Sequence, residues 1–567
     1  MEDVLRVRGI SFEQADDELL VHEVGHYLTQ LQERFMPFGL HVFGRPWSTE
    51  AVNRMVASMT PPDAAAGVRE TSRAALVASP AAEKAALLAA LSGRFVRPGK
   101  GNDPIRSPEA LPTGRNFHAL DGAILPTQIG WTLGQSLAAK ALEERPGTPD
   151  GSEAVVLWAS DTVRDEGAMV AFGFALMGLK PRWNSRGILV GLELLPASPQ
   201  RPRRDVTFVT SGLFRDLYEN LMVWLDRATL LALNASASRI LREHPDLRVA
   251  LNSALARLTA LGPLPTGGDE PLSINQVAAH WIKTVRAELK AGGSARMAGR
   301  RASLRLFGNA PGGYGAGINR LVERSGAWRD RSALAQSYMH RMGHAYGDGI
   351  RGEAAHAAFS DRLRQTEHSY LGRASHLYGL LDNNDGFDYL GGLGLAVEFT
   401  RGKPPAARVI RHSNPSAPQI QALAPALLSE MRGRHLNPQY LEALMAHGYA
   451  GARTLNQGFV ENLWGWQVTS PDIVKSWAWD EANSVLLEDR HDLGLDDFFR
   501  EGRNVHVLTN IQAVLLIAAS RKYWNADAET LRALAQDFAQ NVLVHGLPGS
   551  GHTRPDHPIM AFVGERL

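Results

Sequence analysis

The sequence contains no cysteine among its 567 residues. This absence excludes disulfides, thiolate metal sites, iron–sulfur clusters and a cysteine nucleophile. Any metal ion must therefore be bound by histidine, carboxylates, carbonyls or water. The chain also lacks an excess of charge of either sign, with 60 Lys and Arg against 59 Asp and Glu. This balance gives no support for nucleic acid or an anionic membrane as a partner.

Long apolar runs are absent as well. We find no stretch of about eighteen apolar residues, the length that spans a bilayer. The first 20 residues carry early acidic side chains and no apolar block of signal-peptide length. These features predict a soluble, cytoplasmic protein without a membrane span.

What the chain does contain is an alternation of apolar runs and helical patterns between residues 113 and 226. The strand-like runs are 154–160, 188–195 and 205–212. This alternation is typical of βαβ units on a parallel sheet, whose chemistry lies in the loops at the carboxyl ends of the strands. Polar and charged residues fill two such loops, at 161–166 and 211–216.

The length of the chain allows three or four domains of about 150 residues each. We predict the α/β class, with a multidomain organisation in which a parallel-sheet α/β domain is embedded in largely helical domains. The predicted units are a helical amino-terminal region at 1–112, the α/β domain at 113–230, a helical region with a glycine-rich loop at 231–330, and a mainly helical domain at 331–567.

A glycine-rich segment at residues 305–319 is a further candidate for ligand binding. Glycine permits positive φ and lets the backbone approach a ligand closely. The spacing does not match the dinucleotide fingerprint GxGxxG, and a tight turn before a helix would explain the glycines equally well. A second loop rich in glycine and proline, at 97–106, leads directly into TGRNFHALD at 113–121. Long ordered loops in compact chains are often functional, so this loop is a second candidate.

A short HExxH motif suggests an alternative class, a zinc peptidase. His22 and His26 would lie on one face of a helix with Glu23 beside them, and Glu50 could serve as the third ligand. The match covers only five residues, and its internal Gly25 weakens a helix. The sequence favours a surface helix here and keeps the peptidase as an alternative.

Three other patterns bear on metal or nucleotide binding. His340 and His344 are one helical turn apart, the spacing of metal ligands on a helix, although most such pairs are polar surface residues. The segment 382–393 has the start of a calcium loop but ends in Leu393 where a glutamate is required. The tail 546–553 has His552 in place of the lysine of a phosphate-binding loop, which argues against an ATP site.

Several longer motifs point to a known family. The segments are PTGRNFHALD, PTQIGW, RRDVTFVTSGLFRDLYENLMVWLDRA and RLFGNAPGGYGAGINRLVE. They resemble the large subunit of the ATP-dependent tetrapyrrole metal chelatases, the group of cobaltochelatase CobN and the H subunit of magnesium chelatase. The resemblance extends from about residue 36 to at least residue 486.

The resemblance implies a large subunit that binds a tetrapyrrole and a divalent metal substrate. It favours a nitrogen–metal ligase that inserts Co²⁺ into a corrin precursor, hydrogenobyrinic acid a,c-diamide, in cobalamin biosynthesis. The histidine content and the sequence of the glycine-rich motif favour Co²⁺ over Mg²⁺. A magnesium chelatase H-type protein that inserts Mg²⁺ into protoporphyrin IX is the alternative, and a non-catalytic tetrapyrrole-binding protein is the alternative from another class.

Metal insertion requires a base for the pyrrole N–H protons, cations for the carboxylate side chains of the ring, and an apolar slot. The loops above supply these residue types, and we assign them as hypotheses, with the metal ligands left unassigned. The predicted catalytic residues are His118, Asp121 and Asp216. The predicted substrate-binding residues are Arg115, Asn116, Ser211, Arg215, Asn309 and Tyr314. Asp385, Asp388, Tyr389 and Glu398 are expected to edge the cleft.

The resemblance also implies partners. Family large subunits act with AAA+ ATPase and adaptor subunits, of the CobS/CobT or magnesium chelatase I/D kind, which hydrolyse the ATP that this chain has no loop to bind. Family members usually carry an HGxxE[FW]xPGK motif upstream of the segment that resembles MPFGLHVFG at 36–44, and this chain does not contain it. The chain is therefore expected to be a fragment, one half of a split subunit, or a paralogue.

Overall fold

The structure of the chain is a computed structural model, which describes residues 42–60, 64–100, 104, 108–118, 122–144, 151–259, 267–375 and 379–567. The HExxH motif at 22–26 and the predicted catalytic Asp121 lie outside the described residues.

An eight-stranded sheet forms the centre of the molecule, in the order β12-β11-β10-β3-β6-β7-β8-β9. Its strands are β3 (Ser152–Leu157), β6 (Val206–Thr210), β7 (Leu306–Gly308), β8 (His344–Gly347), β9 (Ile350–Ala354), β10 (Thr366–Arg373), β11 (Ala406–Arg411) and β12 (Gln419–Ala422). The five strands from β11 to β7 are parallel, and antiparallel strands flank them on both sides. The predicted α/β class is confirmed.

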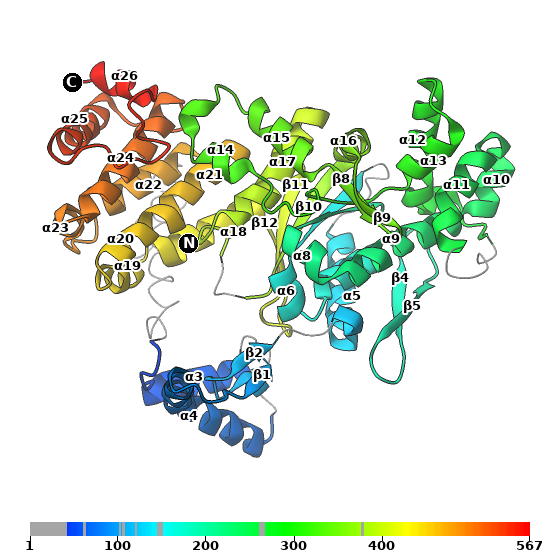
Figure 1. Ribbon diagram of the computed structural model, residues 1–567, viewed down its shortest axis with the longest axis horizontal. Coiled ribbons are helices and arrows are strands. Elements are labelled where there is room, and N and C mark those ends of the chain that lie inside the picture. The colour runs from blue at the N-terminus through cyan, green and yellow to red at the C-terminus, as the bar shows by residue number, and fades with distance from the viewer. Residues whose placement is uncertain are drawn as a thin grey trace, which may run out of the picture.

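Strand β3 shows why the apolar runs form a central strand. All six of its residues are buried, because helices cover both faces of the sheet (Figure 1). Ala154 and Val156 pack into the core on one face, and Val155 and Leu157 pack into the core on the other. A strand buried on both faces reads as a continuous apolar run rather than an alternating one.

Two groups of helices cover these faces (Figure 1). One core includes residues of α5 (Gln128–Glu143), α7 (Ala168–Leu176), α9 (Glu219–Asn234), α10 (Ala237–Glu243), α11 (Arg248–Thr259), α12 (Gln276–Lys290) and α13 (Ala295–Ala302). The other includes residues of α14 (Ile318–Val322), α15 (Ser332–Met342), α16 (His356–Gln365), α17 (Gly392–Arg401), α18 (Leu423–Glu430), α19 (Pro438–Met445), α20 (Tyr449–Leu455), α21 (Glu461–Thr469), α22 (Ser476–Leu486), α23 (Leu495–Arg500), α24 (Asn504–Ser520), α25 (Ala528–His545) and α26 (Ile559–Gly564).

One predicted strand forms, but it lies outside the parallel sheet in which it was expected. The apolar run at 188–195 forms β5 (Leu189–Leu194), which pairs antiparallel with β4 (Leu179–Trp183) in a separate hairpin. The turn from Asn184 to Ile188 is closed by the Asn184 amide, which donates to the Ile188 carbonyl at 3.0 Å. A connection this short joins antiparallel neighbours, because a parallel crossover needs a dozen or more residues.

The amino-terminal described residues form a small unit of their own (Figure 1, blue). It consists of α3 (Thr49–Met59), α4 (Ala66–Leu91) and a parallel pair, β1 (Pro98–Lys100) and β2 (Asn116–His118). Buried Glu83 of α4 ties this unit together, because its carboxylate accepts from the Gly44 amide and the Thr113 hydroxyl, both at 2.7 Å.

Within α4, Gly67–Leu91 is the one stretch of the described residues that has the length and apolar composition of a membrane-crossing helix. It also carries the buried carboxylate that holds the unit together. The predicted boundaries at residues 112, 230 and 330 stay predictions, although the sheet takes strands from both sides of the last two.

Candidate functional site at the carboxyl ends of the parallel strands

The carboxyl ends of the five parallel strands lie at one edge of the sheet. Short helices begin directly after two of them, α6 (Ala159–Arg164) after β3 and α8 (Gly212–Leu217) after β6. The chain order also switches here, because β6 and β7 extend the sheet on one side of β3 and β10 and β11 extend it on the other. Ligands of open α/β sheets bind in the crevice at such a switch point.

Arg215 of α8 holds the glycine-rich loop against this edge. Its guanidinium donates to the carbonyls of Asn309, Ala310 and Gly313 at 3.3, 2.9 and 3.2 Å. It also forms a two-pronged pair with Asp216, at 2.7 and 3.0 Å. The Arg215 side chain is buried, so these groups already occupy its donors.

Asp216 and Tyr314 lie at the surface, next to Arg215 and the loop carbonyls that it contacts. The Tyr314 hydroxyl donates to the Asp216 carboxylate at 2.6 Å. The Asp216 side chain is 39% exposed, and Tyr314 is 58% exposed. The hydrogen bond from Arg215 lowers the pKa of Asp216, and the hydrogen bond to Asp216 raises the pKa of Tyr314. The pair therefore presents a carboxylate and a neutral phenol to a ligand.

Ser211 and Asn309 lie beneath these surface groups. The Ser211 hydroxyl caps α8 by accepting from the Phe214 amide at 3.1 Å. The Asn309 side-chain amide donates to the Gly315 carbonyl at 2.8 Å, while its own side-chain oxygen is buried without a hydrogen-bond partner. The structure therefore brings together five of the predicted site residues, which are Ser211, Arg215, Asp216, Asn309 and Tyr314.

A buried carboxylate fixes the far end of the loop. Asp388 accepts from the backbone amides of Ala316, Gly317, Ile318 and Asn319 at 2.6, 3.4, 2.8 and 3.1 Å. Burial raises the pKa of Asp388 to about 6, although the amides act in the opposite direction. Gly317 has φ +88° at the start of α14, and a Cβ there would lie 2.3 Å from Cδ of Arg341. The loop conformation therefore requires glycine at this position.

Three side chains, Trp158, Asp161 and Arg373, lie between β3 and β10, and only Asp161 belongs to a loop (161–166) that the sequence analysis picked out. The Arg373 guanidinium lies over the Trp158 ring at 5.3 Å and 3.5 Å from the Asp161 carboxylate. Trp158 Nε1, Asp161 Oδ2 and Arg373 Nε are buried without a hydrogen-bond partner. Unpaired buried polar groups are rare and often mark a functional site. Their position relative to the strands could have identified them, because Trp158 directly follows β3 and Arg373 is the last residue of β10.

The other predicted site residues belong to the amino-terminal unit. Arg115 donates to the Leu111 carbonyl at 3.3 Å, and the Asn116 side chain donates to the Val96 carbonyl at 3.2 Å. His118 pairs with Lys100 in the β1–β2 ladder. Both described hydrogen bonds stay inside the unit, so the structure does not join Arg115 and Asn116 to the loops at the sheet edge.

The chain itself limits how far His118 can lie from that edge. The Gly122 carbonyl accepts from the Asn220 side chain at 2.7 Å, which fixes Gly122 near the start of α9. His118 and Gly122 are four Cα steps apart, and at about 3.8 Å per step their separation is at most about 15 Å. The His118 backbone is therefore within reach of the α8–α9 end of the site.

The prediction that His340 and His344 share a helix is wrong. Helix α15 ends at Met342, and His344 opens β8. Both rings instead pack on His356, with ring centroids at 5.0 and 5.2 Å. His552 of the tail is buried and pairs with Glu461 at 2.8 Å, so it faces the protein interior.

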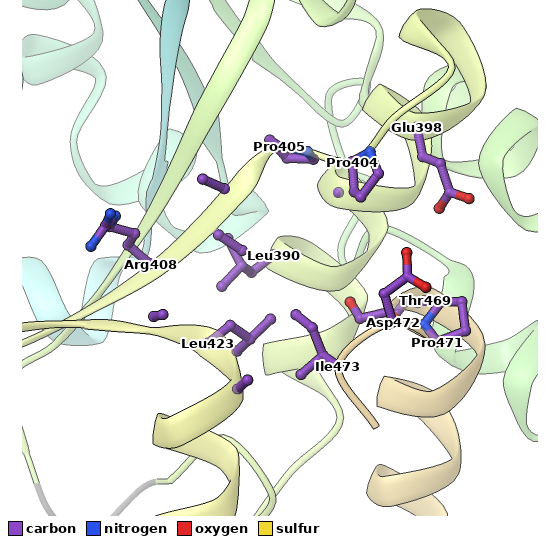
Figure 2. Close-up of a pocket in the computed structure, with 16 residues that line it drawn as sticks. Leu390, Glu398, Pro404, Pro405, Arg408, Leu423, Thr469, Pro471, Asp472 and Ile473 are labelled. Carbon is purple, nitrogen blue, oxygen red and sulfur yellow. The ribbon is translucent and has the colours of Figure 1, made fainter. Parts of the chain in front are cut away.

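A cavity of about 300 Å³ lies at the opposite end of β11 (Figure 2). Its walls come from the segment after α17, the first residues of β11, the start of α18 and residues 469–473, and they are mostly apolar. Glu398, one of the residues expected to edge the cleft, lines this cavity and pairs with Arg331 at 2.6 Å. This volume is at the lower limit of ligand pockets, which span about 300 to 1,000 Å³.

The fold and the site define an α/β protein with a polar, glycine-lined site at the carboxyl edge of a parallel sheet. A model of the CobN/Magnesium Chelatase family matches residues 62–531. The chain belongs to this family, as the sequence motifs predicted.

Named relatives come from both branches of the family. The magnesium-chelatase H subunit of Rhodobacter capsulatus is 32% identical over 533 residues, which cover 93% of this chain and 40% of that protein. The aerobic cobaltochelatase protein CobN of Pseudomonas aeruginosa is 33% identical over 462 residues, which cover 80% of this chain and 34% of that protein. The chain thus spans well under half the length of these relatives.

A solved structure is also similar. The catalytic subunit of cobaltochelatase from Mycobacterium tuberculosis matches with a TM-score of 0.74 and 26% identity, covering 94% of this chain and 47% of that chain. The likeness therefore extends over nearly all of the present chain.

Proposed function

We propose that this chain forms the tetrapyrrole- and metal-binding part of an ATP-dependent metal chelatase, a nitrogen–metal ligase. The observation that carries the proposal is the carboxylate of Asp216 beside the braced glycine-rich loop, at the switch point of the sheet in a chain of the CobN/magnesium chelatase family. A solvent-facing carboxylate next to backbone that a flat ring can approach is suited to accept pyrrole N–H protons.

Each site residue has a role in this proposal. Asp216 accepts a proton, and Tyr314 holds its carboxylate in place through the 2.6 Å hydrogen bond. Arg215 acts as a positioning residue, because its guanidinium is occupied by Asp216 and three loop carbonyls. Ser211 caps α8, and Asn309 holds the glycine-rich loop through the hydrogen bond from its side-chain amide to the Gly315 carbonyl.

The amino-terminal unit supplies the remaining groups. Arg115 and Asn116 would pair with carboxylate side chains of the ring, and His118 and Asp121 would serve as further bases. The connection from His118 to Gly122 supports this arrangement, since it keeps β2 within about 15 Å of the α9 end of the site. Arg373, over Trp158, is a further cation that a ring carboxylate could meet.

The metal substrate is proposed to be Co²⁺, inserted into a corrin precursor such as hydrogenobyrinic acid a,c-diamide. The likeness to a cobaltochelatase catalytic subunit over 94% of the chain supports this choice. A second candidate is Mg²⁺ insertion into protoporphyrin IX, supported by the 93% coverage of the match to a magnesium-chelatase H subunit.

The proposal includes partners. The ATP-dependent step is assigned to separate AAA+ and adaptor subunits, and the part of the large subunit that this chain does not span is assigned to a further segment or polypeptide. A protein that worked in this way would carry out its chemistry inside the cell, with its partners in the cytoplasm.

Two measurements test the proposal. The first is quenching of tryptophan fluorescence of the chain by protoporphyrin IX and by hydrogenobyrinic acid a,c-diamide. We expect saturable binding of one ring, weakened by Arg115→Ala. Failure of both rings to bind up to their solubility limit would refute tetrapyrrole binding.

The second measurement is metal insertion with partner subunits, ATP and the missing part of the large subunit present. We expect Asp216→Asn to slow insertion while ring binding persists. Ring binding with no insertion of either metal would instead identify a tetrapyrrole-binding module. Wild-type binding and turnover in Asp216→Asn would remove this residue from the site.

A further inference from the structure

A second cluster of potential ligands lies beyond Arg373, at the ends of β10 and β11. It consists of Asp382, Glu430 at the end of α18, and His435 (Figure 1 shows α18 beside the sheet). One ligand atom from each of the three lies within 4.8 Å of the others. Among the residues that the structure describes, no other trio of histidine and carboxylate groups meets this spacing.

The His435 ring is the most informative member of the cluster. It is 1% exposed, and its Nε2 is buried without a hydrogen-bond partner. This nitrogen faces Asp382, whose Oδ1 is 3.6 Å away, which is too long for a hydrogen bond. The ring is held on its other sides by stacking on Phe459, with centroids 5.0 Å apart, and by an edge contact with Tyr440 at 5.8 Å.

An unpaired ring nitrogen inside a protein normally costs stability, because buried polar groups are usually hydrogen-bonded. The Nε2 of His435 is in this position, because the structure gives it no hydrogen-bond partner. A neutral imidazole offers a lone pair, which is the form that binds a metal ion.

The two carboxylates are held with part of their oxygen atoms still available. Asp382 Oδ2 accepts from the Gly379 amide and from Arg434, both at 2.5 Å, whereas Oδ1 faces His435. Glu430 accepts one backbone amide on each oxygen, from Leu380 at 2.8 Å and Leu381 at 3.1 Å. Each carboxylate oxygen can accept more than one bond, so these contacts orient the groups without exhausting them.

The close approach of Gly379 to Glu430 is built into the backbone. A Cβ at Gly379 would lie 1.4 Å from Oε1 of Glu430, so only glycine allows this contact. Ligand atoms about 2.1 Å from a tetrahedral Zn²⁺ lie about 3.4 Å apart. A closure of roughly 1 Å by side-chain rotation would bring the present groups to that spacing.

The described residues contain three π-helical turns, η7 (Phe387–Gly391), η8 (Met431–His435) and η9 (Asn456–Val460). Two of them, η8 and η9, contribute to the packing of His435. His435 ends η8, and Phe459, on which it stacks, belongs to η9. Single π-helical turns are uncommon and often occur at functional sites, because they redirect side chains that an α-helix would place elsewhere.

Nearby arginines limit what the site can hold. Arg434 pairs with Asp382, and Arg373 and Arg411 act electrostatically on Glu430. The ligand atoms of Asp382, Glu430 and His435 nevertheless lie within 4.8 Å of one another, and the only cation described as paired with Asp382 is that of Arg434, besides the neighbouring His435 ring. A bound cation with a strong preference for imidazole would supply the missing charge, whereas a bound anion would meet two carboxylates.

We infer that Asp382, Glu430 and His435 bind one divalent transition-metal ion, of the Co²⁺ or Zn²⁺ type, with water completing its coordination. One imidazole and two carboxylates suit these ions, whereas Mg²⁺ and Ca²⁺ prefer oxygen ligands alone. The site shares no residue with the one formed by Asp216 and the glycine-rich loop, and this inference does not depend on the proposed function.

The test is Co²⁺ binding to the full chain after treatment with a chelator, with neither tetrapyrrole nor partner subunits present. Titration is followed by the visible absorption of Co²⁺ and by calorimetry. We expect one strong site per chain that an excess of Mg²⁺ does not displace. In His435→Gln the dissociation constant should rise at least about tenfold, because even groups that only orient a metal ligand contribute that much.

The surface histidines provide the matched control. His340→Gln and His356→Gln change the other group of neighbouring imidazoles, and both variants should bind Co²⁺ like the wild type. Asp382→Asn should weaken binding as well, with its fold checked by thermal unfolding in the absence of metal. If that variant fails to fold, the neutral exchange His435→Gln still decides the question.

Two results would overturn the inference. One is the absence of a strong site in the wild type, and the other is loss of binding in His340→Gln or His356→Gln with unchanged binding in His435→Gln. Because no ring or ATPase takes part, these results leave the proposed chelatase function to be decided by its own experiments.

Discussion

The ionisation of Asp388 determines how the glycine-rich loop is held, and two structural effects on it are opposed. Four backbone amides point at the carboxylate and favour its charged form. Burial disfavours the charge and is the larger effect, so that the pKa rises from 3.8 to about 6. We expect burial to dominate in solution, and the variant Asp388→Asn tests this.

The sign and size of the effect follow from linkage. The native state binds this proton more tightly than the unfolded state, so its contribution to stability is fully present below pH 3.8 and is lost as the pH rises through about 6. The rise of this pKa from 3.8 to about 6 corresponds to a contribution of about 3 kcal/mol to the free energy of unfolding, of which about 1 kcal/mol is lost between pH 5 and pH 7. In Asp388→Asn this pH-dependent part should vanish.

Urea unfolding at pH 5 and pH 7, followed by tryptophan fluorescence, measures the difference. Asp388→Asn is also expected to be less stable at both values, because an amide group replaces one acceptor oxygen and leaves amides unpaired at about 1 to 3 kcal/mol each. The readout is therefore the pH slope and not the absolute stability.

Asp330→Asn is the control, because Asp330 is exposed and its pKa is lowered by hydrogen bonds from Ser332. An identical pH slope in the wild type and in Asp388→Asn would refute the reasoning. It would mean that the four amides outweigh burial and that Asp388 is ionised over the whole range.

Three further predictions concern the loop and the tail. Arg215→Lys should remove most of the hydrogen bonds to Asn309, Ala310 and Gly313 and destabilise the protein by about 2 to 3 kcal/mol. Thermal stability equal to that of the wild type would show that Arg215 does not hold the loop in place. Gly212→Ala places a Cβ 2.5 Å from the Gly313 carbonyl, so ring binding should weaken while far-UV circular dichroism stays unchanged; unaltered affinity would show that the loop can move without consequence. Burial lowers the pKa of His557 from 6.5 to about 4, so the neutral ring contributes to stability above pH 6.5 and this contribution is lost as the pH falls toward 4. In urea unfolding, His557→Gln should therefore lose less stability than the wild type between pH 7 and pH 5. An equal loss in both proteins would argue against a role for this histidine.

The sequence predicted the central strands because their burial leaves a visible trace. β3 and β6 are buried on both faces and read as continuous apolar runs. β5 reads similarly but belongs to a hairpin, since hydrophobicity alone does not distinguish pairing partners. β10 was not predicted because polar residues interrupt its apolar pattern, among them Ser369, which is buried, and His368, which is half-buried. Such tertiary burial of polar residues is not encoded in local pattern.

The loops at 115–121, 211–216 and 309–317 were predicted to share one site. The structure places 211–216 and 309–317 in contact through Arg215, whereas the hydrogen bonds described for Arg115 and Asn116 stay within the amino-terminal unit. The role of Arg215 could not be predicted, because its donors are used by carbonyls about a hundred residues away in the chain. Arg373 could not be predicted either, since its place beside Trp158 arises only when β10 inserts next to β3.

Arg373 lies between two groups of acidic side chains at the carboxyl edge of the sheet, Asp161 on one side and the cluster of Asp382 and Glu430 on the other. Its guanidinium lies near Asp161 on one side and donates to the Gly379 carbonyl at 3.4 Å on the other, next to Asp382. A cation between two acidic groups lowers the repulsion between them. The guanidinium of Arg373 therefore allows Asp161 and the carboxylates of the Asp382 cluster to be charged at the same time. An Arg373→Met variant should therefore raise the pKa values of nearby acids such as Asp385. It should also change the affinity for the tetrapyrrole ring and the affinity for Co²⁺ together. Independent effects on ring binding and on Co²⁺ binding would show that Arg373 does not link them.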